Sequence, residues 1–156
     1  MSNSKAIYWF RQDLRLLDNP ALVEATRNSS ILPIYILDDI NPKELIMGAA
    51  SRFWLHHSLN SLNKSLDQNL SIYNGDPLEI ILEITYRLDI KEIYWNRCYE
   101  PWRIKRDTKI KKELESNGIK VTTLNGSLLW EPWTIKKGDG TPVSYTHLRA
   151  HETVLD

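Results

Sequence analysis

The regular alternation of short apolar runs with longer helical segments constrains the fold of this chain more than any other feature. Four segments have the composition and ends of helices: 20–27, 51–67, 78–88 and 103–117. Between and around them, β-branched and aromatic residues mark five buried strands: 5–10, 31–37, 70–73, 91–95 and 119–124. Because such alternation builds a parallel sheet with helices on both faces, we predict an α/β fold, a five-stranded, Rossmann-like, three-layer sandwich.

Capping residues mark the ends of several predicted helices. Asp18 or Asn19 can cap the first helix, and Pro20 suits its first turn. The sequence Asn-Gly-Asp-Pro at 74–77 forms a turn that leads into the third helix, and Gly118 ends the last one. The segment 96–102 is expected to be a loop.

Length and composition limit the class of protein. The chain has 156 residues, the size of one domain, and a formal net charge of zero, which gives no support to a main DNA-binding role for this segment. Cys98 is the only cysteine, so no disulfide can form within the chain, as suits a reducing cytoplasm. No signal peptide and no membrane span is evident. We expect a cytoplasmic monomer without a membrane partner.

Common cofactor and metal motifs are missing from the sequence. It contains no GxGxxG, no GxxxxGK[ST], no CxxC and no HExxH. His56 and His57 are adjacent in a predicted helix and point in different directions, so they are poor joint ligands. Cys98 has no base beside it in the sequence and is expected to be an inert thiol. We therefore predict no metal site.

The carboxyl ends of the strands are where a ligand site is expected, because parallel α/β sheets bind ligands beyond that edge. Arg11, Asp13 and Arg15 follow the first strand and can form an ion-pair network that locks the loop. Arg11 lies nearest to the strand end, so it is the better candidate for contact with a ligand.

Residues 9–22, WFRQDLRLLDNPAL, resemble the opening signature of the photolyase and cryptochrome family. Further motifs resemble the family in the same order, over residues 5–142 in all: PIYILD at 33–38, SRFWL at 51–55, GDP at 75–77, YWN at 94–96, YEPW at 99–102, RD at 106–107 and GDG at 138–140.

The resemblance implies that residues 1–142 are the amino-terminal domain, which holds a light-harvesting antenna chromophore. In this family a larger helical domain follows, which binds FAD and damaged DNA and carries the light-driven repair. That domain is absent here, so we expect no catalytic residue and no repair by this chain alone. Residues 143–156 match nothing in the family and resemble adapter read-through; we expect them to be artefactual or loosely held.

Family members carry a folate, a deazaflavin or a flavin as antenna. Folate-type members place an Asn-Glu pair where this chain has Trp102-Arg103, so the resemblance favours a deazaflavin or flavin over methenyltetrahydrofolate. A planar ring needs an apolar wall and a few polar contacts. The candidate chromophore-binding residues are Phe10, Arg11, Leu37, Asp38, Asp39, Met47, Arg52, Leu55 and Glu100.

Three functions are consistent with the sequence. The first is the antenna domain of a deoxyribodipyrimidine photolyase, most similar to those that repair cyclobutane pyrimidine dimers. The second is the same domain of a cryptochrome, a blue-light photoreceptor without repair. The third is a stand-alone nucleotide-binding module, for which Gly138-Asp139-Gly140 is a poor phosphate loop.

Overall fold

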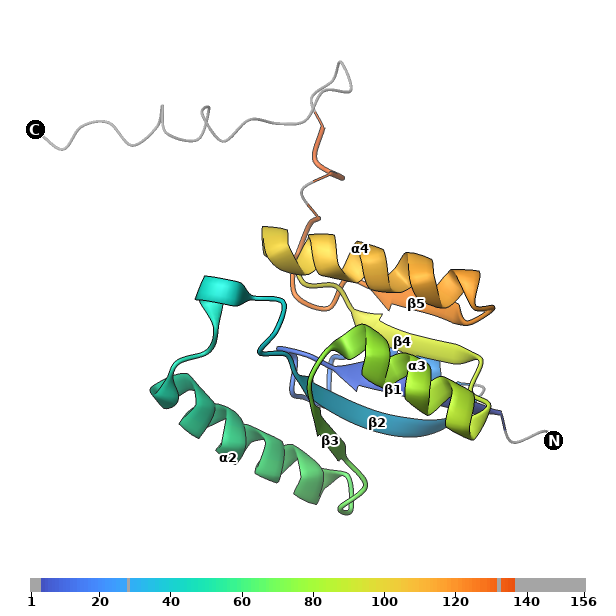
Figure 1. Ribbon diagram of the computed structural model, residues 1–156, viewed down its shortest axis with the longest axis horizontal. Helices are drawn as coiled ribbons and strands as arrows, with labels where there is room; N and C mark the ends of the chain where they lie inside the picture. Colours follow the sequence, from blue (N-terminus) through green and yellow to red (C-terminus); the bar gives the residue numbers. More distant parts are fainter. Residues whose placement is uncertain (1–3, 28, 132, 137–156) are drawn as a thin grey trace, which may run out of the picture.

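The five predicted strands form a single, entirely parallel sheet in the computed structural model, which describes residues 4–27, 29–131 and 133–136 (Figure 1). The strands are β1 (Lys5–Phe10), β2 (Ser30–Leu37), β3 (Ser71–Asn74), β4 (Glu92–Asn96) and β5 (Lys120–Leu124). Their spatial order is β3-β2-β1-β4-β5, so the chain reverses its direction of winding between β1 and β4. The predicted fold class is confirmed.

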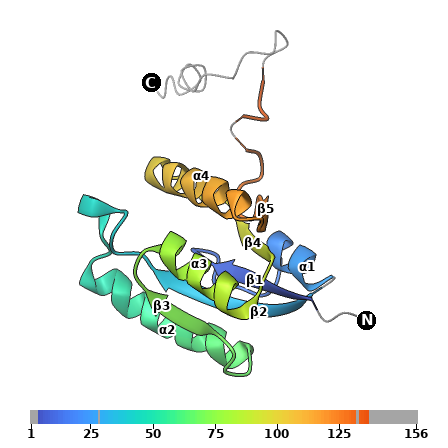
Figure 2. The same cartoon turned by 45° about the vertical axis from the view of Figure 1, so that its right-hand side comes forward.

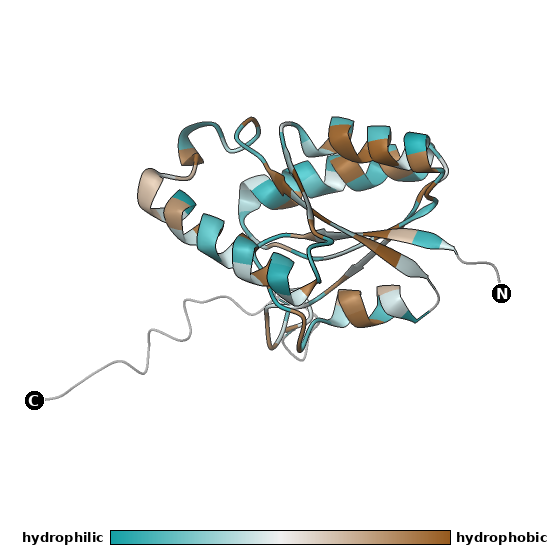
Figure 3. Ribbon diagram, turned by 90° about the horizontal axis from the view of Figure 1, so that it is seen from below, coloured by the Kyte–Doolittle hydropathy of each residue, from teal (hydrophilic) through white to brown (hydrophobic). Residues whose placement is uncertain are grey.

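Helices cover both faces of the sheet. They are α1 (Pro20–Thr26), α2 (Ala49–Ser65), α3 (Pro77–Leu88) and α4 (Pro101–Ser116), with a short 3-10 turn, η1 (Lys43–Leu45), before α2. Figure 2 shows α1 beside β4 and β5, and in Figure 3 the strands run between α3 and α4 on one side and α1 and α2 on the other. None of the described helices is long and apolar enough to cross a membrane.

The core is divided by the sheet into two apolar clusters. One cluster joins alternate residues of the strands, such as Ile7 and Trp9, to Ile81 of α3 and Leu114 of α4. The other joins the residues between them, such as Tyr8, to α1 and α2. Since alternate strand residues point to opposite faces, a strand buried on both sides must be apolar throughout, which explains the continuous run of β1.

Local sequence accounts for where the helices begin. The side chain of Asn19 accepts a hydrogen bond from the Leu22 N–H, and Asp76 caps α3 in the same way through the N–H groups of Leu78 and Glu79. The predicted loop at 96–102 is wrong at both ends, because β4 extends to Asn96 and α4 begins at Pro101, where a proline suits the first turn. The predicted tail, 143–156, lies outside the described residues.

Candidate functional site

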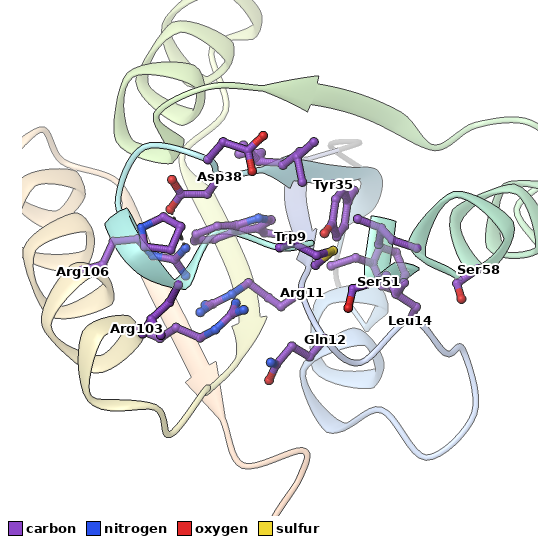
Figure 4. A pocket seen from close by; sticks show the side chains of 18 of the residues that line it. Trp9, Arg11, Gln12, Leu14, Tyr35, Asp38, Ser51, Ser58, Arg103 and Arg106 are labelled. Atoms are coloured by element: carbon purple, nitrogen blue, oxygen red, sulfur yellow. Dashed lines mark hydrogen bonds and ion pairs between the residues drawn. The ribbon is translucent and has the colours of Figure 1, made fainter. Parts of the chain in front are cut away.

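A cavity of about 280 Å³ opens at the carboxyl ends of β1 and β2 (Figure 4). Its walls come from the end of β1 and the residues after it, from the connection between β2 and α2, from α2 itself and from the first turns of α4. The cavity therefore lies next to the point where the strand order reverses, at the edge where ligands bind in sheets of this kind.

The structure brings most of the predicted site residues to this cavity. Seven of the nine line it: Phe10, Arg11, Leu37, Asp38, Asp39, Met47 and Leu55. The other two, Arg52 and Glu100, lie outside the lining. Their role in chromophore binding remains a prediction.

Arg52 and Glu100 each hold a segment that does line the cavity. The Arg52 guanidinium donates to the Asp39 carboxylate at 2.8 Å and to the Met47 carbonyl at 2.9 Å, which ties the β2–α2 connection to α2. Glu100 accepts a hydrogen bond from the Gln12 side chain at 2.7 Å, across the opposite wall. Burial acts to raise the pKa of Glu100, but hydrogen bonding and nearby arginines lower it overall.

Several lining residues were not among the predicted ones. They are chiefly Tyr35, Trp54, Trp102, Arg103 and Arg106. Tyr35 is an ordinary residue of a buried strand, and α4 was predicted to begin at Arg103, which left Trp102 in a loop. The signal that could have found the α4 residues is the Pro at 101, which places the next residues on the first turn of a helix at the sheet's ligand-binding edge.

A buried group of ions forms one end of the cavity. Arg106 of α4 donates to Asp38 at 2.8 Å and to its neighbour Asp107 at 2.9 Å, and Arg11 donates to Asp107 at 2.6 Å. Burial acts to raise the pKa of Asp38, but the Asn41 N–H and Arg106 lower it overall. Burial acts to lower the pKa of Arg106, but the carboxylates of Asp107 and Asp38 raise it overall. Asp38 and Arg106 are therefore both charged near neutral pH.

Guanidinium groups stack over two of the tryptophans that line the cavity. The Arg11 guanidinium lies 4.4 Å from the centre of the Trp9 ring, and that of Arg106 lies 5.3 Å from it. The centre of the Trp102 ring lies 4.5 Å from the Arg103 guanidinium and 5.0 Å from that of Arg106. Such stacking stabilises a folded protein by about 0.5–2 kcal/mol for each pair.

Two nitrogen donors of Arg11 and one of Arg103, its Nε, are buried without a hydrogen-bond partner among the described residues. The Arg11 side chain is 2% exposed, yet its Nε and Nη1 atoms make no hydrogen bond within the described part of the chain. The Tyr35 hydroxyl also has no hydrogen-bond partner among the residues that the structure places, and Figure 4 shows its ring at the cavity. Buried donors are nearly always paired, so an ordered water or a ligand with acceptor atoms would satisfy the Arg11 donors.

The loop after β1 is locked by hydrogen bonds rather than by the predicted ion pairs. Asp13 accepts hydrogen bonds from the Tyr8 hydroxyl at 3.3 Å and from the Asn96 side chain, which also donates to Asn19 at 2.7 Å. In the described residues Asp13 forms no ion pair with Arg11 or Arg15, although it accepts a hydrogen bond from the Arg11 backbone N–H at 3.2 Å. Its neutral partners come from β1 and β4, which a pattern of charges along the chain does not reveal.

A separate polar cluster holds the segment that follows β5. Glu131 accepts hydrogen bonds from Arg97 at 2.6 Å and from the Tyr99 hydroxyl at 2.7 Å. Burial raises the pKa of Tyr99 to about 12, and the bond to Glu131 contributes in the same direction. Nearby, burial raises the pKa of the Cys98 thiol, as expected for an unreactive cysteine.

Comparison with known families gives one match over nearly the whole chain. The family model for DNA photolyase matches residues 6–153. Among curated proteins, cryptochrome-2 of Arabidopsis thaliana is 36% identical over 145 residues, and a deoxyribodipyrimidine photo-lyase of Agrobacterium fabrum is 33% identical over 147 residues. These alignments cover 90% and 91% of this chain but 24% and 30% of the relatives.

Solved structures give the same result. A bacterial class III photolyase from Agrobacterium tumefaciens matches with a TM-score of 0.82 and 34% identity, over 94% of this chain and 31% of its own. An archaeal photolyase from Sulfolobus tokodaii, solved with two FAD molecules and described as implying a novel light-harvesting cofactor, matches with a TM-score of 0.71 and 28% identity, over 85% of this chain and 32% of its own. The chain thus spans less than a third of these relatives.

Proposed function

Because this chain belongs to the DNA photolyase family, we propose that its cavity binds a light-harvesting antenna chromophore for a deoxyribodipyrimidine photolyase. The matched region of the relatives is their amino-terminal domain, which has the same α/β fold. The parent protein would use light to repair DNA, with FAD and damaged DNA bound by a second, helical domain. The present chain corresponds to the antenna domain of such a protein.

The observation that carries the proposal is the pair of unpaired donors on Arg11. A buried guanidinium with two unpaired nitrogen atoms is costly unless another group accepts hydrogen bonds from them. The rings of flavins, deazaflavins and folates carry carbonyl oxygens that suit these donors. Arg11 is held at the cavity by Asp107 and by stacking on Trp9, so only a small movement of its guanidinium would bring these donors to a ligand.

The rest of the cavity suits a flat ring. Its volume of about 280 Å³ is near the lower end of ligand cavities, about 300–1,000 Å³, which matches a ring system with its tail outside. Phe10, Leu37, Met47 and Leu55 provide apolar contacts, while Tyr35 provides a hydroxyl. We favour a flavin or deazaflavin over methenyltetrahydrofolate, since a tricyclic ring can use both the apolar wall and the Arg11 donors.

A cryptochrome is the second candidate, since cryptochrome-2 of Arabidopsis thaliana is among the similar proteins. Both functions use the same antenna-domain architecture, so the cavity does not separate them. The sequence of the parent's helical domain would, because the lesion pocket of a repair enzyme lies there. A stand-alone nucleotide-binding module is not favoured by any of the comparisons.

The proposal is tested by titrating the 156-residue chain separately with FMN, a deazaflavin and methenyltetrahydrofolate, with absorption and fluorescence as readouts. We expect micromolar or tighter binding of one of the tricyclic compounds, and Tyr35→Phe to weaken it by about tenfold through loss of one hydrogen bond. Arg27→Ala, which alters an exposed ion pair on α1, is the control and should bind normally. No binding by any of the three would overturn the proposal, and binding of the folate alone would overturn the preference for a tricyclic ring.

A further inference from the structure

The placement of positive charge over the cavity tryptophans has a consequence for a bound chromophore that absorbs light. An excited flavin-type chromophore is a strong oxidant, and an indole in contact with it is an electron donor. One electron would pass from the indole to the chromophore, leave an indole radical cation, and return as the pair recombines. The excitation would be lost as heat before it could be passed on.

We propose that the guanidinium groups over Trp9 and Trp102 suppress this electron transfer and so preserve the excited state of the antenna chromophore. The proposal rests on the function proposed above. Both tryptophans line the cavity, and each has two guanidinium groups within 5.3 Å of its ring centre. A positive charge at this distance disfavours a radical cation on the ring, and more so for a buried ring such as that of Trp9 than for one in solvent.

The neighbouring carboxylates do not cancel this arrangement. Asp38 and Asp107 bind Arg106 through its N–H groups, that is, at the edge of the planar guanidinium, and Arg11 is bound by Asp107 in the same manner. The faces of the guanidinium groups remain available to the rings. The carboxylates hold the Arg11 and Arg106 guanidinium groups in place beside the Trp9 ring.

Trp54 provides a comparison within the same cavity. It also lines the wall, but its side chain is 71% exposed, and no guanidinium stacks on it among the described residues. On this proposal Trp54 is the least protected donor of the three. Trp54→Phe should therefore lengthen the excited-state lifetime of the chromophore, whereas Trp102→Phe should change it little.

The test is the fluorescence lifetime of FMN bound to the 156-residue chain at saturating concentration. Arg103→Gln is the first variant, because the Arg103 side chain is 20% exposed and Arg106 is more deeply buried. We expect the lifetime to fall about threefold or more, with a transient indole radical cation in the absorption spectrum. Arg103→Lys, which keeps the charge, should retain most of the lifetime.

A double variant separates this role from packing. Arg103→Gln with Trp102→Phe removes the donor that has lost one of its two guanidinium groups and should restore the lifetime, which a purely structural role of Arg103 would not allow. Arg87→Gln removes an exposed arginine of α3 and is the matched control. An unchanged lifetime of bound FMN in Arg103→Gln would overturn this inference alone. Failure of every chromophore to bind would instead overturn the proposed function, and this inference with it.

Discussion

The Arg106 guanidinium, on the first half of α4, forms an ion pair at 2.8 Å with the carboxylate of Asp38, the residue that follows β2. The two side chains are 6% and 5% exposed. The two residues are 68 positions apart in the sequence and meet at one end of the cavity. The pair therefore joins the helix to the segment that follows the strand. Removing one partner of a buried ion pair is strongly destabilising, because the remaining charge is left without compensation.

We expect Asp38→Asn to lower the free energy of unfolding by about 2 kcal/mol at pH 7, less than for an isolated pair, because Asp107 still compensates Arg106. The pKa of Asp38 is lower in the folded protein than its unfolded value of about 3.9. The stabilisation is thus fully present above about pH 4–5 and is lost as the pH falls through the folded pKa.

Urea unfolding between pH 3 and 7 measures this effect. The difference in the free energy of unfolding between wild type and Asp38→Asn should become smaller as the pH falls toward 3. Asp89→Asn, which removes an exposed pair with Lys91 and keeps a residue that tolerates a positive φ, should show almost no change. A constant difference across the range would contradict the assignment of the effect to the Asp38 charge.

Gly126 lies against the hydrogen-bonded network that locks the loop after β1. A Cβ at this position would lie 2.5 Å from Cγ and 2.9 Å from Cβ of Asn96. The Asn96 side chain cannot move aside, because it is bonded to both Asp13 and Asn19. Gly126→Ala should therefore destabilise the protein by about 1–3 kcal/mol. Thermal unfolding of both variants measures the effect. Gly48→Ala, with no atom within 4 Å of the added Cβ, should lower the stability clearly less.

Arg52 holds the β2–α2 connection in place without lining the cavity. We expect Arg52→Ala to release Asp39 and the Met47 carbonyl, and to weaken chromophore binding by about five- to tenfold through added disorder in the wall. The thermal midpoint should change little, since the Arg52 side chain is 38% exposed. Isothermal titration and thermal unfolding of the same variant separate the two effects; a parallel loss of both would show that Arg52 supports the fold instead.

Alkaline unfolding reports on the cluster around Glu131. The pKa of Tyr99 is raised to about 12 in the folded protein, against about 10 when unfolded. A raised folded pKa contributes stability that is present below pH 10 and is lost as the pH rises through 12. Tyr99→Phe should be less stable than wild type at pH 8 and should lose less stability between pH 10 and 12. The variant should still lose some stability over this range, because the pKa of Tyr94 is also raised to about 12.

The sequence was sufficient for the sheet and most of the cavity wall. Strands buried on both faces require continuous apolar runs, so β1 could be placed to the residue, and the strand ends then located Phe10, Leu37 and Asp38. What it could not supply were contacts between distant segments. The side-chain partners of Asp13 come from β1 and β4, and the ionic partners of Arg11 and Asp38 come from α4.

Local context also misled one assignment. Arg11, Asp13 and Arg15 are close in sequence, and opposite charges suggested pairing, but parallel strands bring other partners nearer. Arg15 instead donates to the carbonyl groups of Asp18 and Gly126. The choice between neighbouring and distant partners depends on the packing of the sheet, which local charge spacing does not encode.

The single connection from β2 to α2, together with α2, supplies the wall of the cavity opposite Arg11 and Arg106, including Asp39, Met47 and Leu55. No strand of the sheet depends on the side chains at 40–47 for its hydrogen-bonded pairing. Substitutions in this stretch can therefore reshape one side of the site while the scaffold stays the same. A family built on this sheet has a simple evolutionary route to exchange one light-absorbing pigment for another.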